Sequence, residues 1–167
     1  ELLGLGSTSL CYVGSDSDFR MDIAALERQI AEDRALGMRP ACVIATAGTT
    51  NTGAIDDLRA IGAICKRETI WFHVDGCIGA LLKISPGHRH LVDGIEAADS
   101  LALDPHKWLH TPFEAGCALV RDADRHVSTF EAHGEYLEKH GRGVIAGKLL
   151  GDYGFELSRG FKALKIW

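Results

Sequence analysis

Three short segments carry side chains that could do chemistry, and each follows a predicted strand. Residues 47–53, Ala-Gly-Thr-Thr-Asn-Thr-Gly, come after an apolar run and supply hydroxyls and backbone amides. Asp75 comes directly after the apolar run at 70–74, and Lys107 follows the run at 100–103 within Asp-Pro-His-Lys. Because ligands of open α/β sheets bind beyond the carboxyl ends of the strands, we expect these groups to meet in one site.

A lysine, a carboxylate and phosphate donors are together what pyridoxal phosphate requires of a protein. Lys107 would form the Schiff base, and a desolvated, electropositive pocket would keep its amine partly neutral. Asp75 would hold the ring nitrogen protonated, so that the ring can accept the electron pair released at the substrate carbon. Thr50 would pack near the ring or its 3′-oxygen. His106 and Asp104 would contact the phosphate or hold the loop.

The spacing of apolar residues predicts the elements that position these groups. The predicted strands are residues 10–13, 41–46, 70–74, 100–103 and 117–120. The predicted helices are residues 23–36, capped by Asp22, residues 58–65, capped by Asp56, and residues 91–98. Strands separated by helices of about a dozen residues indicate a parallel α/β sheet.

Composition narrows the class of protein. The 167 residues are 46% hydrophobic and 25% charged, which fits one domain with a real core and excludes wholesale disorder. A net charge of −5 is unfavourable for binding nucleic acid or an anionic membrane, and no apolar run is long enough for a transmembrane helix. The five cysteines are scattered and form no C-x-x-C pair, so we expect a reducing compartment, the cytoplasm.

Five motifs spread over nearly the whole chain carry a resemblance. They are DFRMD at 18–22, TAGTT at 46–50, HVDG at 73–76, DPHKWL at 104–109 and LSRGFKALKIW at 157–167. Together they resemble the pyridoxal-phosphate-dependent group II amino-acid decarboxylases, which include aromatic-amino-acid, tyrosine, histidine and glutamate decarboxylases. The resemblance implies an α/β fold of the aspartate-aminotransferase type, fold type I, with a mostly parallel sheet flanked by helices. This chain would be an incomplete large domain of that fold.

The resemblance also implies a domain organisation. Residues 1–150 would be part of the cofactor-binding large domain, with a mobile catalytic loop at about 122–150. Residues 151–167 would begin the connection to the small domain. Both ends look cut, so we expect a piece of a longer protein, inactive by itself, with the ring-stacking histidine and the phosphate loop upstream. Members of the family are homodimers with sites at the subunit interface.

Carried over position by position, the resemblance assigns roles to single residues. Lys107 becomes the Schiff-base lysine, His106 its phosphate-side neighbour and Asp75 the partner of the pyridinium nitrogen. Thr50 becomes a cofactor-contacting threonine. Asp104 stands near the phosphate, where the family often has Asn.

Two further residues are assigned in the same way. Tyr136 resembles the loop tyrosine that protonates the substrate carbon after carbon dioxide leaves; a surface tyrosine on a helix is the alternative. A Phe at that position is associated with aldehyde formation, so Tyr136 predicts simple decarboxylation. Cys77 stands where the family usually has a small Ala against the cofactor ring, and we interpret it as a tolerated packing change rather than a nucleophile.

The expected function is decarboxylation of an L-amino acid to the amine and carbon dioxide. Trp108-Leu109 and Pro112-Phe113 resemble the aromatic-amino-acid branch. The alternatives are a related enzyme of the same fold (an aldehyde synthase, or a glutamate or sulfinoalanine decarboxylase) and a catalytically silent piece used for dimerisation. No metal is expected, because His88-x-His90 and the His106/His110 pair each lack a third ligand. No Gly-rich nucleotide-binding pattern is present either.

Overall fold

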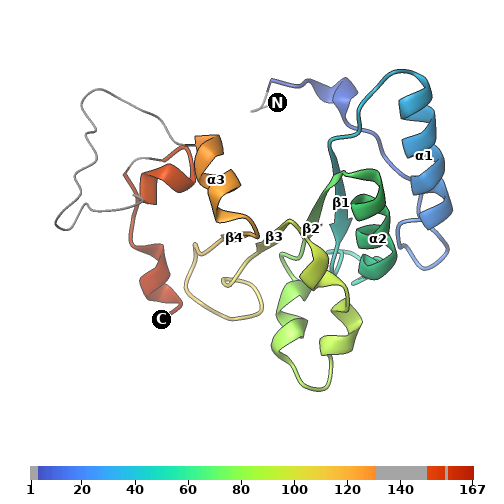
Figure 1. Cartoon of the computed structure of the whole chain (residues 1–167). Coiled ribbons are helices and arrows are strands. Elements are labelled where there is room, and N and C mark those ends of the chain that lie inside the picture. Colours follow the sequence, from blue (N-terminus) through green and yellow to red (C-terminus); the bar gives the residue numbers. More distant parts are fainter. Residues whose placement is uncertain (1–3, 131–149, 157) are drawn as a thin grey trace, which may run out of the picture.

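A computed structural model describes residues 4–130, 150–156 and 158–167 (Figure 1). Within these residues one sheet has the strand order β1-β2-β3-β4. Its strands are β1 (Cys42–Thr46), β2 (Trp71–Asp75), β3 (Ser100–Leu103) and β4 (Cys117–Val120). The first three are parallel, whereas β4 runs antiparallel to β3. The expected α/β class with a mostly parallel sheet is therefore confirmed.

Three α-helices are described, and short 3₁₀ turns connect the remaining elements. The helices are α1 (Ile23–Ala35), α2 (Leu58–Glu68) and α3 (Ala123–Phe130). The 3₁₀ turns are Ser7–Ser9, Gly79–Ile84, Arg89–Val92, Ile95–Ala97, Leu150–Tyr153 and Lys162–Lys165. Helix α1 begins as predicted, because the Asp22 carboxylate accepts a hydrogen bond from the Ala25 N–H at 3.1 Å. It ends just before Gly37, whose φ of 76° suits a glycine.

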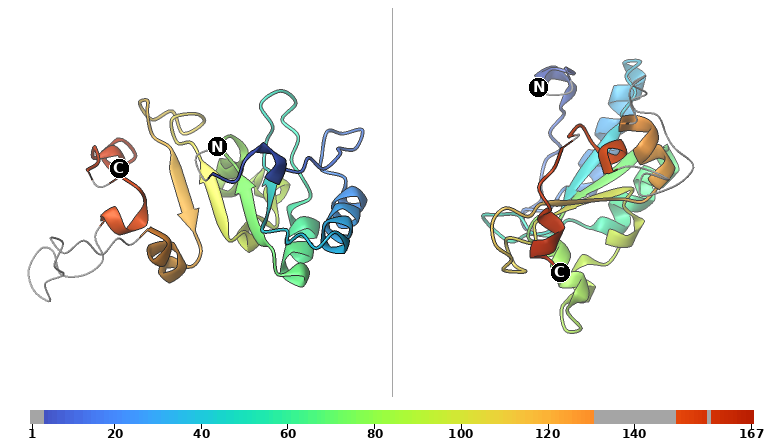
Figure 2. Two further views of the ribbon diagram at one scale, coloured as in Figure 1. Left: turned by 90° about the horizontal axis from the view of Figure 1, so that it is seen from above. Right: turned by 90° about the vertical axis from the view of Figure 1, so that its left-hand side faces the viewer.

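The core lies between the sheet and the pair α1 and α2, which cover one of its faces (Figure 2). Alternation along β2 turns Phe72 and Val74 toward these helices, where they are 1% and 0% exposed. Leu58 and Ile61 of α2 pack against them in the same cluster. On the opposite face of β1, Ile44 remains 53% exposed. In the described part of the chain, the sheet is therefore packed on one face only.

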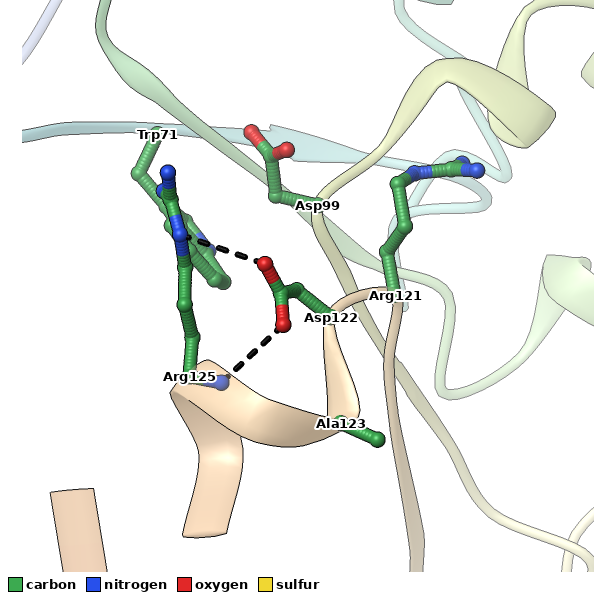
Figure 3. A pocket seen from close by; sticks show the side chains of 6 residues that line it. All are labelled: Trp71, Asp99, Arg121, Asp122, Ala123 and Arg125. Atoms are coloured by element: carbon green, nitrogen blue, oxygen red, sulfur yellow. Dashed lines mark hydrogen bonds and ion pairs between the residues drawn. The ribbon is translucent and has the colours of Figure 1, made fainter. Parts of the chain in front are cut away.

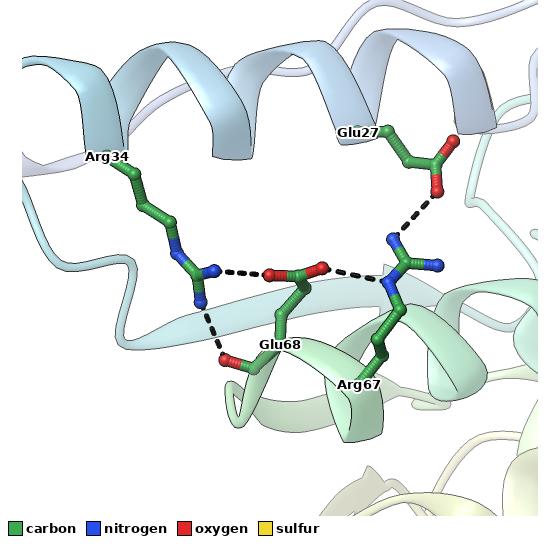
Figure 4. Close-up of polar contacts among 4 residues, drawn as sticks. All are labelled: Glu27, Arg34, Arg67 and Glu68. Carbon is green, nitrogen blue, oxygen red and sulfur yellow. Dashed lines mark hydrogen bonds and ion pairs between the residues drawn. The ribbon is translucent and has the colours of Figure 1, made fainter.

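An ion-pair network joins α1 to the end of α2 (Figure 4). Arg67 donates to Glu27 and to Glu68, each at 2.8 Å. Arg34 pairs with the Glu68 carboxylate and also donates to the Glu68 carbonyl oxygen at 2.8 Å. These side chains are largely at the surface, where solvent screens each ion pair, so the network mainly sets how the two helices align.

The strand expected at residues 10–13 is wrong. This segment is irregular and follows the 3₁₀ turn at Ser7–Ser9. Leu10 and Tyr12 are 53% and 86% exposed. A strand needs a neighbour to pair with, and residues 10–13 pair with none of the described strands, so their β-like composition does not lead to a ladder.

The helix expected at residues 91–98 is also wrong. Two 3₁₀ turns take its place and are separated by Gly94, whose φ is 99°. A Cβ on Gly94 would lie 2.5 Å from the Arg59 backbone nitrogen. The chain therefore passes close against the start of α2, and this contact imposes a bend that an α-helix cannot make.

The predicted cap of α2 is displaced by one residue. Asp57, not Asp56, caps the helix by accepting from the Ala60 N–H at 3.0 Å. The Asp56 carboxylate instead accepts from Met21 N and Thr46 N, both at 2.7 Å. Asp56 thus ties the end of β1 to the segment that precedes α1, a contact between distant residues that local sequence does not show.

Candidate active site

The carboxyl ends of the three parallel strands lie level with one another. The register pairs Thr46 with Asp75 and Asp75 with Ala102. Pairing continues one residue further, since Ala47 N donates to Asp75 O at 2.8 Å and Gly76 N to Ala102 O at 2.9 Å. The loops after β1, β2 and β3 therefore start from one edge, as the sequence predicts.

Two glycines let the loops after β1 and β2 pack against each other. Gly79 N donates to the Ala47 carbonyl oxygen at 2.9 Å, and a Cβ on Gly79 would lie 2.5 Å from that oxygen. Gly48 has a φ of 88° and packs against Gly79 from the other side. This close packing holds the start of the β2 loop in place, where Cys77 N donates to the Asp75 carboxylate at 3.2 Å.

The Cys77 thiol lies against the carboxylates of Asp75 and Asp104. Burial, followed by the hydrogen bonds and charges of these two carboxylates, raises the pKa of Cys77 to about 12. The thiol therefore stays protonated at neutral pH and acts as a hydrogen-bond donor. A protonated thiol is a poor nucleophile, so Cys77 is unsuited to covalent catalysis.

Lys107 forms an ion pair with Asp104 on the loop between β3 and β4. The distance from Lys107 Nζ to Asp104 Oδ2 is 2.7 Å, and Lys107 N also donates to the Asp104 carbonyl oxygen at 2.9 Å. The hydrogen bond to Asp104 raises the pKa of Lys107; burial opposes this shift, and the nearby Cys77 and Asp75 add to it. The same hydrogen bond lowers the pKa of Asp104.

The electrostatic surroundings of Lys107 differ from those expected. The sequence predicts an electropositive pocket that keeps the amine partly neutral, but the groups that raise its pKa are the carboxylates of Asp104 and Asp75 and the Cys77 thiol. The Lys107 side chain is also 40% exposed, so burial is too weak to outweigh them. The arrangement therefore favours the ammonium form of Lys107.

His106 is oriented by the same loop. Its Nδ1 accepts a hydrogen bond from the Ala115 N–H at 3.0 Å, and its ring meets the Phe113 ring edge-on with centroids 5.0 Å apart. Because Nδ1 is an acceptor, the neutral imidazole carries its proton on Nε2. His106 can therefore offer an N–H donor to an anionic group.

Thr50 and Tyr136 are not brought into this cluster by the described contacts. Thr50 is exposed in the loop after β1, a loop closed by the Gly53 N–H bond to the Thr49 carbonyl at 2.8 Å. Hydrogen bonds and ion pairs among the described residues do not link Thr50 to Lys107. Tyr136 falls within residues 131–149, outside the described part of the chain.

A polar chain on the open face of the sheet is not anticipated by the sequence reasoning. Trp71 Nε1 donates to Ser100 Oγ at 2.8 Å, and Ser100 Oγ lies 2.7 Å from His73 Nδ1. Since indole only donates, the Ser100 hydroxyl accepts from Trp71, while the direction of its hydrogen bond with His73 Nδ1 depends on the His73 tautomer. Burial lowers the pKa of His73, and the charge of Asp75 opposes this shift. The alternation of Trp71, His73 and Asp75 along β2 was the available signal, because it places all three on one face.

A surface cavity lies at the other end of the strands (Figure 3). Its volume is about 520 Å³, and it is lined by Trp71, Asp99, Arg121, Asp122, Ala123 and Arg125. Asp99 accepts from Phe72 N at 2.8 Å, and Arg121 donates to the Ala98 carbonyl oxygen at 3.0 Å. Figure 3 shows the remaining two charged side chains, Asp122 and Arg125, paired with each other. These charges support the local structure, so we place the chemistry at the strand ends instead.

Comparison with known proteins decides the family. The family model described as the pyridoxal-dependent decarboxylase conserved domain matches residues 3–167. The chain belongs to this family. The expected resemblance is therefore confirmed, and so is pyridoxal phosphate as the cofactor of the family.

Relatives and solved structures extend this result. The chain is 42% identical over 167 residues to the aromatic-L-amino-acid decarboxylase of Bacillus atrophaeus and covers 35% of it. It is 39% identical over 168 residues to the cysteine sulfinic acid decarboxylase of Mus musculus and covers 34% of it. The crystal structure of Oryza sativa TDC with PLP and tryptamine matches 99% of this chain, at a TM-score of 0.88 and 32% identity, over 34% of its own length. The chain thus spans about a third of the proteins it matches.

The residues at the strand ends fit the cofactor of this family. The Lys107 amine and the Asp75 carboxylate both interact with the Cys77 thiol, so they share one edge of the sheet. An amine can bind the aldehyde of pyridoxal phosphate, and a carboxylate can face its ring nitrogen. The Nε2–H of His106 adds a donor suited to phosphate. The chemistry of these donors matches the group.

Proposed function

We propose that the complete protein carrying this chain decarboxylates an L-amino acid to the amine and carbon dioxide with pyridoxal phosphate. The observation that carries the proposal is the grouping of Lys107 and Asp75 around one thiol at the carboxyl edge of the sheet. Membership of the pyridoxal-dependent decarboxylase family supports it. The bound cofactor would supply a ring that accepts electrons from the substrate carbon.

Each residue of the site has a distinct part in this proposal. Lys107 would hold the cofactor through its amine, and Asp75 would face the ring nitrogen and favour its protonated form. His106 donates from Nε2 on the phosphate side, and Asp104 lies beside it. Thr50 contacts the cofactor from the loop after β1, which starts at the same edge as Asp75.

Two residues act next to the ring. Cys77 would pack its protonated thiol against the cofactor in place of the usual Ala, and the raised pKa of Cys77 argues against a nucleophilic role. Tyr136 falls within the catalytic loop expected at about 122–150, of which residues 123–130 instead form helix α3. We assign Tyr136 the return of a proton to the substrate carbon after carbon dioxide leaves. The loop belongs to a large-domain part at residues 1–150, and residues 151–167 begin the connection to a small domain.

For the substrate we favour an aromatic L-amino acid. The identity of 42% to an aromatic-L-amino-acid decarboxylase supports this choice. The cysteine sulfinic acid decarboxylase at 39% identity supports sulfinoalanine as the second candidate. The two identities are too close to decide between the two substrates. The choice of substrate side chain therefore depends on residues other than those that these relatives share with this chain.

The assembly and compartment belong to the same proposal. We infer a homodimer from the family resemblance, and a cytoplasmic location is supported by five cysteines that are all free thiols. The acidic net charge of −5 argues against a nucleic-acid partner. In the part of the chain that the structure describes, no helix is long and apolar enough to cross a membrane.

The test is an assay of the complete protein. Carbon dioxide release is measured across aromatic, acidic and basic amino acids, with sulfinoalanine included, while chromatography separates amine from aldehyde products. Borohydride reduction followed by peptide mass spectrometry should place the cofactor on Lys107, and Lys107→Ala should lose both the label and the visible absorbance. Cofactor fixed to another lysine, or binding without turnover of any amino acid, would count against the proposal. The latter outcome would favour the silent, dimerising alternative.

A further inference from the structure

The Asp104–Lys107 ion pair suggests a role that the family resemblance does not assign. We propose that Asp104 is a positioning residue that keeps the Lys107 amine protonated and anchored to the end of β3 in the cofactor-free protein. This inference rests on the proposed function, because it concerns the lysine that would bind the cofactor. It assigns Asp104 to the amine rather than to the phosphate.

The geometry of the pair is that of a closed turn. The side chains meet at 2.7 Å from Nζ to Oδ2, while the backbone of Lys107 donates to the Asp104 carbonyl at 2.9 Å. Side-chain and backbone contacts therefore hold the same two residues together. The Asp104 side chain is less exposed than the Lys107 side chain, at 21% against 40%, so the more buried Asp104 anchors the more exposed Lys107.

The groups around the pair all favour its charged form. Lys107 faces Asp104, Asp75 and the Cys77 thiol, and its own pKa is raised. Asp104 faces Lys107, Cys77 and His106, each of which lowers the pKa of its carboxylate. Among the described groups that act on Lys107, the charged ones are the carboxylates of Asp104 and Asp75, because the protonated Cys77 thiol is neutral. A neutral amine is therefore disfavoured as long as Asp104 keeps its charge.

Protonation controls the reactivity of a lysine, because only the neutral amine is a nucleophile. Asp104→Asn keeps the size of the side chain but removes its charge. The ammonium form of Lys107 then loses its closest counter-charge, the pKa of Lys107 falls, and more neutral amine exists at a given pH. Asp104→Glu keeps the negative charge, so most of the Lys107 amine should remain protonated.

Competitive acetylation of the complete, cofactor-free protein tests this inference directly. Trace acetic anhydride is applied between pH 6 and pH 11, and labelling of each lysine is measured by peptide mass spectrometry. In Asp104→Asn, labelling of Lys107 near pH 8 should rise by about threefold, as expected for a partly exposed ion pair. Its pH profile should also move to lower pH, while labelling of Lys83 should not change.

A matched control is available in Glu114→Gln. Glu114 pairs with Lys162 at 2.7 Å, so this variant removes a comparable ion pair elsewhere. It should raise labelling of Lys162 and leave Lys107 unchanged. Unchanged labelling of Lys107 in Asp104→Asn, or an equal rise of Lys107 labelling in the control, would overturn the inference.

If Asp104→Asn loosens the fold, acetylation of Lys83 should rise together with that of Lys107. The unmodified protein then supplies a second measurement. The pH midpoint of Lys107 labelling must lie above that of an N-acetyl-lysine amide standard, and a midpoint at or below the standard overturns the inference. Pyridoxal phosphate takes no part in these measurements. Failure of borohydride to label Lys107 would therefore refute the proposed function without altering this result.

Discussion

At the scale of single residues, one thiol and two carboxylates surround the amine expected to bind the cofactor. Asp104 lies 2.7 Å from Lys107 Nζ, and Asp75 accepts from Cys77 N at 3.2 Å. The two carboxylates thus have different partners although both face the same thiol. This difference suits Asp75 to the ring nitrogen and Asp104 to the amine.

Replacing Asp75 by Asn tests its role toward the ring nitrogen. The variant should still bind pyridoxal phosphate on Lys107, but decarboxylation should slow by about two to three powers of ten, because a charge partner of the transition state is lost. The measurements are the turnover number and the borohydride-fixed cofactor content. Asp93→Asn is the control, since Asp93 pairs with Arg59 at 3.0 Å. A variant that turns over at the normal rate would exclude the role of Asp75.

The pKa of Cys77 predicts slow alkylation. Below a pKa of about 12 the reactive thiolate grows with pH, so the rate of iodoacetamide labelling of Cys77 should rise by about tenfold per pH unit from pH 8 to pH 11. The cofactor-free protein is used, and exposed Cys11 serves as the reference thiol. A plateau of the Cys77 rate below pH 10 would contradict the hydrogen bonding described for this thiol.

Tyr136→Phe tests the assignment of the loop tyrosine. If Tyr136 returns the proton to the substrate carbon, its loss should shift the product from amine toward aldehyde. Chromatographic separation of the two products measures the ratio. Tyr12→Phe is the matched control, because Tyr12 is 86% exposed in the irregular N-terminal segment. If both variants yield only amine, the assignment of Tyr136 fails.

At the scale of elements, the site depends on how closely two loops approach each other. The chain after β2 packs its backbone against the chain after β1, and Gly79 makes this approach possible. Neighbouring aspartates show the same dependence on tertiary contacts: Asp57 caps α2, whereas Asp56 binds backbone amides before α1 and at the end of β1. The sequence predicts a cap here but assigns it to Asp56, and the structure gives that part to Asp57.

Gly79→Ala should destabilise the loop that carries Cys77. The new Cβ would lie 2.5 Å from the Ala47 carbonyl oxygen, a backbone atom that cannot turn aside, so the free energy of unfolding should fall by about 1–3 kcal/mol. Urea denaturation of the complete protein measures it. Gly87→Ala is the control, because nothing lies within 4 Å of the position that its new methyl group would occupy. Equal stability of the two variants would show that the loops do not pack as described.

At the scale of the whole molecule, the described sheet is packed on one face and exposed on the other. Ile44 on that open face is 53% exposed, and Phe113 and Phe155 are 80% and 81% exposed. The relatives are about three times as long as this chain, which covers 35% of the one from Bacillus atrophaeus. Exposed apolar surface of this kind typically contacts another part of a protein or a partner.

A protein shortened to these 167 residues should therefore expose apolar surface. The isolated chain should bind the dye ANS more strongly per mole than the complete protein and should release no carbon dioxide from any amino acid. Dye fluorescence and the decarboxylation assay measure these outcomes, with the complete protein as the reference. Activity in the isolated chain would show that the site needs no residues outside it.

The sequence by itself determined the four described strands, helices α1 and α2 and the grouping of Asp75 with Lys107, because strand periodicity and strand-end motifs are local patterns. It did not reveal that residues 10–13 lack a partner strand or that Gly94 packs against Arg59. Only the tertiary structure decided the charge on Lys107. A pKa depends on which groups lie within a few ångströms and on how far water reaches them. The carboxylate of Asp104, folded back onto Lys107 within one loop, and that of Asp75, brought close by the neighbouring strand β2, reversed the expected direction.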